Sequence, residues 1–135
     1  MTDSRRPRIS VVNDNPDFLE LMSAILDEDA GYEVSLFAGE RTTAAELAGS
    51  APDLLIIDLL LGGVSGWELV VLARADARLA SVPVIVCSAD VTELRGRAAE
   101  LERIGDIHVL EKPFGVDQVT DLVDRLVGRT VPQTG

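Results

Sequence analysis

Hydrophobic and polar residues alternate along the chain in two kinds of segment. Short runs rich in Leu, Val and Ile are separated by longer segments in which apolar residues recur every three or four positions, as on one face of a helix. The short runs predict strands at residues 8–12, 32–36, 54–59, 83–87 and 107–110. The run 54–59 is nearly continuous, which is typical of a strand covered by helices on both faces.

The longer segments predict five helices. The first is the best marked, because Asn15 fits an N-cap and Pro16 the first helical position, and Gly31 is expected to end it. A second helix is expected over 42–49, and the last is expected to end at Gly128. The apolar stripes of four of these helices are Phe18, Leu21, Met22, Ile25 and Leu26; Trp67, Val70 and Val71; Leu94, Ala98 and Leu101; and Val116, Val119, Leu122, Val123 and Leu126.

Five β/α units predict a doubly wound α/β fold, a five-stranded parallel sheet with helices on both faces, because parallel strands need crossover connections. One domain over residues 8–128 accounts for the pattern, between polar ends at 1–7 and 129–135 that we expect to be flexible. Ligands of such sheets bind beyond the carboxyl ends of the strands. Polar residues at those ends are therefore the candidates for function.

Charge narrows the classes of partner. The 135 residues carry 12 basic and 23 acidic side chains, a net charge of −11. Such a surface repels phosphate backbones and anionic lipid, so we expect no direct binding of nucleic acid or membrane. No secretory signal begins the chain, the longest apolar stretch, 54–61, is too short to cross a bilayer, and Cys87 is the only cysteine. These features predict a cytoplasmic protein.

Polar side chains close four of the five predicted strands: Asn13 and Asp14, Asp58, Ser88, and Lys112. Taken singly, each has a simpler explanation as a turn residue, a helix cap or a surface charge. Taken together, Asp14 and Asp58 would repel each other without a cation, and hard oxygen ligands favour Mg²⁺. Lys112 is the only lysine among 12 basic residues, which indicates a specific role for its compact ammonium.

These strand ends fit a wider pattern. It consists of Asp14, Asp58, the loop to Gly66, Cys-Ser-Ala at 87–89 and Glu-Lys-Pro-Phe at 111–114. In order and spacing the pattern resembles the receiver domain of two-component response regulators, the CheY-like family. The resemblance implies a flavodoxin-like (βα)₅ fold and transfer of a phosphoryl group to an aspartate from a histidine kinase or phosphotransfer protein, with Mg²⁺ beside it.

By position, the resemblance implies that Asp58 is the phosphoacceptor, Ser88 the hydroxyl that binds the phosphoryl group and Lys112 the cation that pairs with it. It implies a Mg²⁺ held by Asp14, Asp58, the backbone carbonyl of Leu60 and, weakly or through water, Asn13. Phosphoryl transfer needs mainly positioning and neutralisation of charge, which these groups can supply.

The sequence departs from the family at several positions. Asn13 stands where an acid is usual, so we expect weaker Mg²⁺ binding and less repulsion in the metal-free pocket. Val109 stands where a switching Tyr or Phe is usual, so the output surface must signal differently. Gly62 replaces a proline and leaves its loop more mobile. Leu60 and Asp90 flank the path of attacking water, and an apolar Leu60 predicts a long-lived phosphoryl group.

We therefore expect a single-domain response regulator, a signalling phosphoacceptor rather than a metabolic enzyme, that acts by binding an unidentified downstream protein. Only seven residues follow Gly128, too few for an effector domain unless the chain is a piece of a longer protein. Formation of a homodimer stays open. The alternative, motivated by Asn13 and Val109, is a pseudo-receiver that binds partners without phosphorylation.

Two other classes of protein use a similar sheet edge. A haloacid-dehalogenase-like phosphatase needs a second acid two residues after its nucleophile, where this chain has Leu60. A flavodoxin-like FMN binder needs a phosphate-binding loop after the first strand, where Asn13, Asp14 and Asp17 would repel phosphate. Both are disfavoured.

Overall fold

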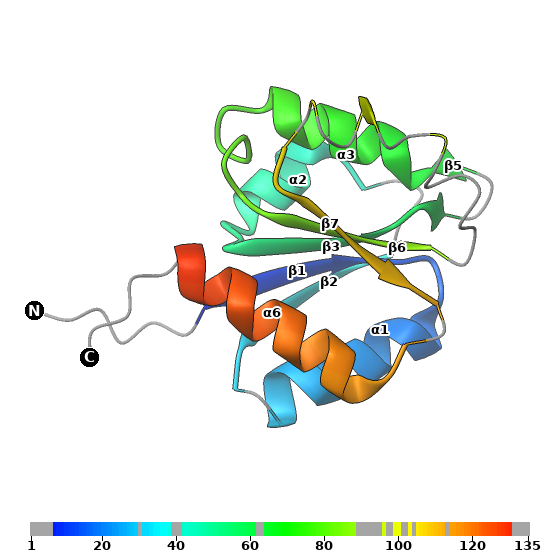
Figure 1. The fold of residues 1–135 in the computed structure, drawn as a ribbon, viewed down its shortest axis with the longest axis vertical. Helices are drawn as coiled ribbons and strands as arrows, with labels where there is room; N and C mark the ends of the chain where they lie inside the picture. Colours follow the sequence, from blue (N-terminus) through cyan, green and yellow to red (C-terminus); the bar gives the residue numbers. More distant parts are fainter. Residues whose placement is uncertain are drawn as a thin grey trace, which may run out of the picture.

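The computed structural model describes residues 7–29, 31–38, 42–61, 64–88, 96, 99–100, 103, 105–112 and 114–130. A five-stranded parallel sheet of order β2-β1-β3-β6-β7 forms its centre (Figure 1). The strands are β1 (Arg8–Val12), β2 (Glu33–Phe37), β3 (Leu54–Asp58), β6 (Val84–Ser88) and β7 (Ile107–Glu111). Every residue of β3 and β6 is buried, as the continuous apolar runs predicted.

Helices cover both faces of the sheet and confirm the predicted doubly wound fold. Figure 1 shows α1 (Pro16–Ser23) and α6 (Val116–Thr130) on one face, and α2 (Ala44–Gly49) and α3 (Gly66–Ala75) on the other. Alternate residues of β3 point to opposite faces, as strand geometry requires. Leu54 and Ile56 join the core under α1 and α6, whereas Leu55 and Ile57 join the core under α2 and α3.

The two helices nearest the chain ends differ from the prediction. Instead of one α-helix to Gly31, α1 gives way to the π-helix η1 (Ala24–Asp29), and Gly31 follows with φ +80°. The prediction that the last helix ends at Gly128 was wrong, because α6 continues to Thr130. A glycine costs a helix only about 1 kcal/mol relative to Ala, so it does not by itself end one.

Two short strands occupy the described residues of the crossover after β3. Strands β4 (Leu60–Leu61) and β5 (Val64–Ser65) pair antiparallel before α3 begins. The predicted fourth helix around Leu94, Ala98 and Leu101 lies outside the described residues, as do Gly62 and Asp90. In the described part of the chain, no helix is both long and apolar enough to span a membrane.

Arg74, near the end of α3, ties the helix to the amino-terminal edge of the sheet. Its guanidinium donates to four backbone carbonyl oxygens, those of Leu79 at 3.0 Å, Val82 at 2.6 Å, Gly105 at 3.3 Å and Asp106 at 3.2 Å. Two of these carbonyls lie between α3 and β6, and the other two lie directly before β7. One side chain therefore joins a helix to the entry of two strands.

Gly66, at the opposite end of α3, packs directly against the end of β3. A Cβ atom at this position would lie 2.0 Å from the backbone oxygen of Asp58. The Gly66 N–H also donates to the carbonyl of Leu59 at 2.9 Å. Only a glycine lets the helix begin this close to the strand, so Gly66 sets the position of α3 relative to Asp58.

Replacing Gly66 with Ala should destabilise the protein, because the new methyl group cannot fit without moving β3 or α3. We expect the free energy of unfolding to fall by roughly 1–3 kcal/mol or more, the usual cost of overpacking. Urea unfolding measures this. Gly49→Ala is the matched control, since Gly49 lies in α2 with no atom within 4 Å of its added Cβ, and it should leave stability equal or higher. Equal stabilities for Gly66→Ala and the wild type would contradict this role.

Candidate functional site

Buried polar side chains gather at the carboxyl edge of the sheet. Asn13 follows β1, Asp58 ends β3 and Ser88 ends β6, and their exposed fractions are only 1%, 4% and 6%. Ser10 is the one other buried polar residue in the described part of the chain. Because β1, β3 and β6 are neighbours in the sheet, the three residues occupy one edge.

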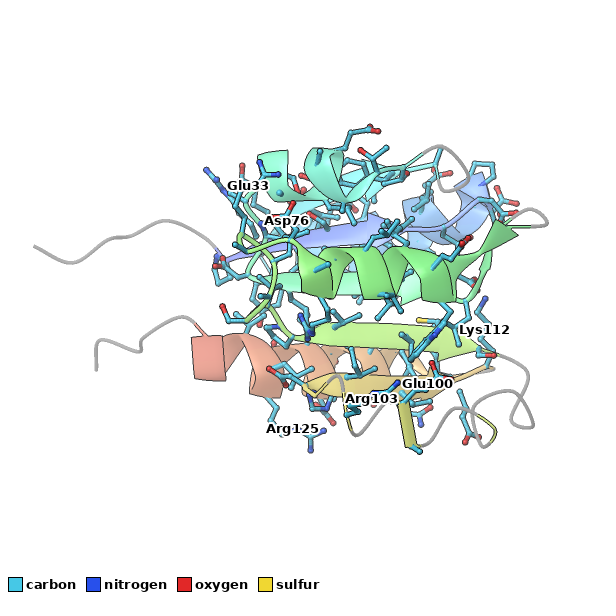
Figure 2. All side chains as sticks on the ribbon, turned by 90° about the horizontal axis from the view of Figure 1, so that it is seen from above. Glu33, Asp76, Glu100, Arg103, Lys112 and Arg125 are labelled. Carbon is cyan, nitrogen blue, oxygen red and sulfur yellow. The ribbon has the colours of Figure 1, made fainter. Side chains whose placement is uncertain are left out.

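Asp58 is held by two side chains at one carboxylate oxygen. The Asn13 Nδ2 group donates to Asp58 Oδ2 at 2.8 Å, and the Lys112 ammonium donates to the same oxygen. Figure 2 shows Lys112 at the end of the molecule opposite Glu33 and Asp76. A carboxylate buried without partners is costly. Asn13 and Lys112 therefore offset the cost of burying the Asp58 side chain by donating hydrogen bonds to it.

Asn13 also connects Asp58 to the start of α1. Its Oδ1 accepts a hydrogen bond from the Asn15 N–H at 2.8 Å, and the Asn15 side chain accepts in turn from the N–H groups of Asp17 and Phe18. This geometry confirms Asn15 as the N-cap. An aspartate at position 13 could not donate to Asp58, so the amide makes a contact that an acid would replace by repulsion.

Backbone hydrogen bonds place Ser88 and Lys112 next to each other on the edge. The Lys112 N–H donates to the Ser88 carbonyl at 2.9 Å, and the Leu59 N–H donates to the Cys87 carbonyl at 3.0 Å. Burial, together with the charge of Asp58, raises the pKa of the Cys87 thiol from 9.0 to about 12. The thiol beside the site is therefore neutral at physiological pH.

The oxygen donors of this edge suit Mg²⁺. The exposed carboxylate of Asp14 follows Asn13, and Leu60 supplies a backbone carbonyl in β4, directly after β3. No three His, Cys, Asp or Glu side chains form a metal-binding group within the described ranges. Mg²⁺ needs only one or two carboxylates, since it keeps several waters. Asp14 and Asp58 would supply those carboxylates, whereas Asn13 directs its amide nitrogen toward Asp58.

Phe18 is a site residue that the sequence reasoning missed. Its stripe position predicted a core residue, and it does pack against the core under α1 and α6. Its ring also lies against Lys112, with the Nζ atom 5.4 Å from the ring centroid. Phe114 meets Phe18 edge to face, at 6.1 Å between centroids. The signal available in the sequence was the place of Phe18 in the first turn after Asn15.

The fourth and fifth β/α units contain Val109, the position of the missing aromatic switch, and two further side-chain contacts. Val109, in place of the usual aromatic residue, lies on β7 with 39% of its surface exposed. His108 contacts Asp106 at 2.9 Å, near the amino-terminal end of β7 and away from the site. In α3, the Trp67 indole N–H donates to the Glu100 carboxylate at 3.2 Å. This bond joins α3 to the fourth unit.

Comparison with known proteins identifies the family. The family model described as "Response regulator receiver domain" matches residues 9–124. The DNA-binding dual master transcriptional regulator RpaA of Synechocystis sp. is 32% identical over 94% of this chain, which spans 52% of that relative.

Solved structures agree. The signal receiver domain of a histidine kinase from Syntrophus aciditrophicus is 25% identical, with a TM-score of 0.79 and 96% of each chain covered. The receiver domain of a Pseudomonas aeruginosa sensor histidine kinase, which has a magnesium ion in its active site cleft, is 26% identical, with a TM-score of 0.71 over 91% of this chain and 98% of that one. The sheet order, the buried Asp58 and these matches lead to one conclusion: the chain belongs to the response regulator receiver domains, the CheY-like modules of two-component signalling.

Proposed function

We propose that Asp58 accepts a phosphoryl group from a histidine kinase or phosphotransfer protein, and that the phosphorylated domain signals by binding a downstream protein. One observation carries this proposal. Asp58 is a buried carboxylate at the carboxyl edge of the sheet, and Asn13 and Lys112 both donate to its Oδ2. A buried charge held by two donors is pre-organised for attack, because little solvent has to be removed from it.

The transfer exchanges one bond for another. An oxygen of Asp58 attacks the phosphorus of a phosphohistidine, the P–N bond breaks, and its electron pair stays on the imidazole, which then takes a proton. Lys112 turns from the carboxylate toward a phosphoryl oxygen, and the Ser88 hydroxyl donates to another. Asn13 continues to hold the Asp58 side chain. These groups supply the positioning and charge neutralisation that phosphoryl transfer requires.

Mg²⁺ would be held by Asp14, Asp58 and the backbone carbonyl of Leu60, and would neutralise charge on the phosphoryl oxygens. Asn13 contributes no charge to this set, and its Nδ2 group is directed at Asp58. We infer that the metal binds more weakly here than beside two adjacent acids. The bound metal and Lys112 would share the neutralisation of charge.

The output route is inferred from contacts near Asp58. Gly66 packs on the backbone of Asp58, and its neighbour Trp67 bonds to Glu100 in the fourth unit. A shift at the end of β3 would therefore reach that unit through α3. Exposed Val109 does not provide the aromatic switch usual in the family. Net charge favours a protein target over nucleic acid.

The alternative function is a pseudo-receiver that binds partners without phosphorylation. The observation that favours it is the pair of contacts at Asp58, because Asn13 and Lys112 already compensate its charge without a metal ion or phosphoryl group. A resting state stabilised in this way depends less on Mg²⁺ or a phosphoryl group for its stability. The two functions differ in whether Asp58 reacts.

Intact-mass spectrometry after incubation with acetyl phosphate and Mg²⁺ separates them. Wild type should gain the mass of one phosphoryl group as acetate leaves, and Asp58→Asn should gain none because an amide is not a nucleophile here. Asp17→Asn, which removes an exposed acid from α1, is the matched control and should behave as wild type. An unmodified wild-type protein would favour the pseudo-receiver, and an adduct on Asp58→Asn would show that the phosphoryl group sits elsewhere.

A further inference from the structure

A closed cycle of side-chain and backbone contacts begins and ends at Asp58. Asp58 Oδ2 accepts from Asn13 Nδ2, Asn13 Oδ1 accepts from the Asn15 N–H, and Asn15 Oδ1 accepts from the Phe18 N–H at 3.4 Å. The Phe18 ring lies against the Lys112 ammonium, and that ammonium donates back to Asp58 Oδ2. Helix α1 is therefore joined to Asp58 on two sides, once through the amide of Asn13 and once through Lys112.

The contact between Phe18 and Lys112 differs from the others because it uses no hydrogen bond. A cation within about 6 Å of an aromatic centroid is attracted by the negative face of the ring. The Lys112 Nζ atom lies 5.4 Å from the Phe18 centroid. Phe114 meets Phe18 at an interplanar angle of 84°, and both rings pack on the core under α1 and α6. Packing therefore holds the ring that faces the ammonium.

Lys112 needs such a contact because its stem is flexible. A lysine side chain has four carbons and high rotamer freedom, and that of Lys112 is 31% exposed, enough to let it swing into solvent. During phosphoryl transfer the ammonium has to turn its N–H groups from Asp58 to the incoming oxygens. Attraction to a ring face survives that turn, since it does not depend on where the N–H groups point.

We propose that Phe18 is a positioning residue whose ring holds the Lys112 ammonium at Asp58 before and during phosphoryl transfer. The proposal rests on the proposed function of Asp58 as phosphoacceptor. A leucine at position 18 would fill much of the same space without a charged ring face, and a tyrosine would keep that face. Phe18→Leu and Phe18→Tyr therefore separate attraction from packing.

The first test reads Lys112 directly and needs no phosphoryl donor. Because Lys112 is the only lysine, isotope-labelled lysine gives the NMR signals of one side chain. In wild type the ring current of Phe18 should shift the signals of the methylene protons beside Nζ upfield. Phe18→Leu should remove the shift and Phe18→Tyr should keep it. Leu19→Ala, at the neighbouring α1 residue on the same core, is the control and should also keep it. An unchanged shift in Phe18→Leu would overturn the proposal.

The second test measures the rate constant of phosphorylation by acetyl phosphate. Phe18→Leu should lower it by about 2- to 5-fold, the size of a cation–π attraction at a partly exposed site. Phe18→Tyr and Leu19→Ala should stay near the wild-type rate. In a Lys112→Met background, Phe18→Leu should cause no further loss, because its effect passes through the ammonium.

An equal loss in both backgrounds would show that Phe18 acts only by packing and would overturn the proposal. A wild-type protein that takes no phosphoryl group would instead overturn the proposed function, and with it any role of Phe18 in the transfer. The lysine signals would still decide whether the ring holds Lys112. The two failures are therefore distinguishable.

Discussion

The burial of one charged carboxylate is the constraint on which the rest of the site depends. Asp58 ends the central strand β3 with only 4% of its surface exposed, so its charge has to be stabilised by the protein. Asn13 and Lys112 provide that stabilisation at a single oxygen. They directly follow β1 and β7, the strands that flank the pair β3 and β6, so both contacts form only when these four strands are assembled.

The same contacts link the fold to the signalling chemistry of the family. Asn13 joins Asp58 to the cap of α1, and Gly66 joins its backbone to the first turn of α3. The proposed change of charge at Asp58 would therefore act on helices of both faces of the sheet. In the proposed transfer, Lys112 would leave the carboxylate for a phosphoryl oxygen. Local electrostatics can in this way bias the arrangement of whole elements.

Periodicity predicted the sheet and most helices because the core residues repeat with the geometry of their element. The positions of the strand ends also predicted that Asp58, Asn13 and Lys112 lie together, since parallel strands share one carboxyl edge. The contact between Phe18 and Lys112 was not predictable, because it joins residues far apart in the chain and Phe18 also satisfies a helical stripe. The four carbonyl contacts of Arg74 and the π-helical turn of η1 depend likewise on tertiary geometry that no local pattern encodes.

The stability of Asn13→Asp, measured by urea unfolding with a chelator and then with Mg²⁺, tests the central role of the amide most directly. Without metal, the second carboxylate beside Asp58 removes a donor and adds repulsion, so we expect the free energy of unfolding to fall by roughly 1–3 kcal/mol. Mg²⁺ should restore much of that loss and should stabilise wild type less. The gain in stability from a ligand grows with the affinity of the folded protein for it, and we expect Asn13→Asp to bind Mg²⁺ more tightly. Equal stability of the two proteins in chelator, with the same gain from Mg²⁺, would contradict the account.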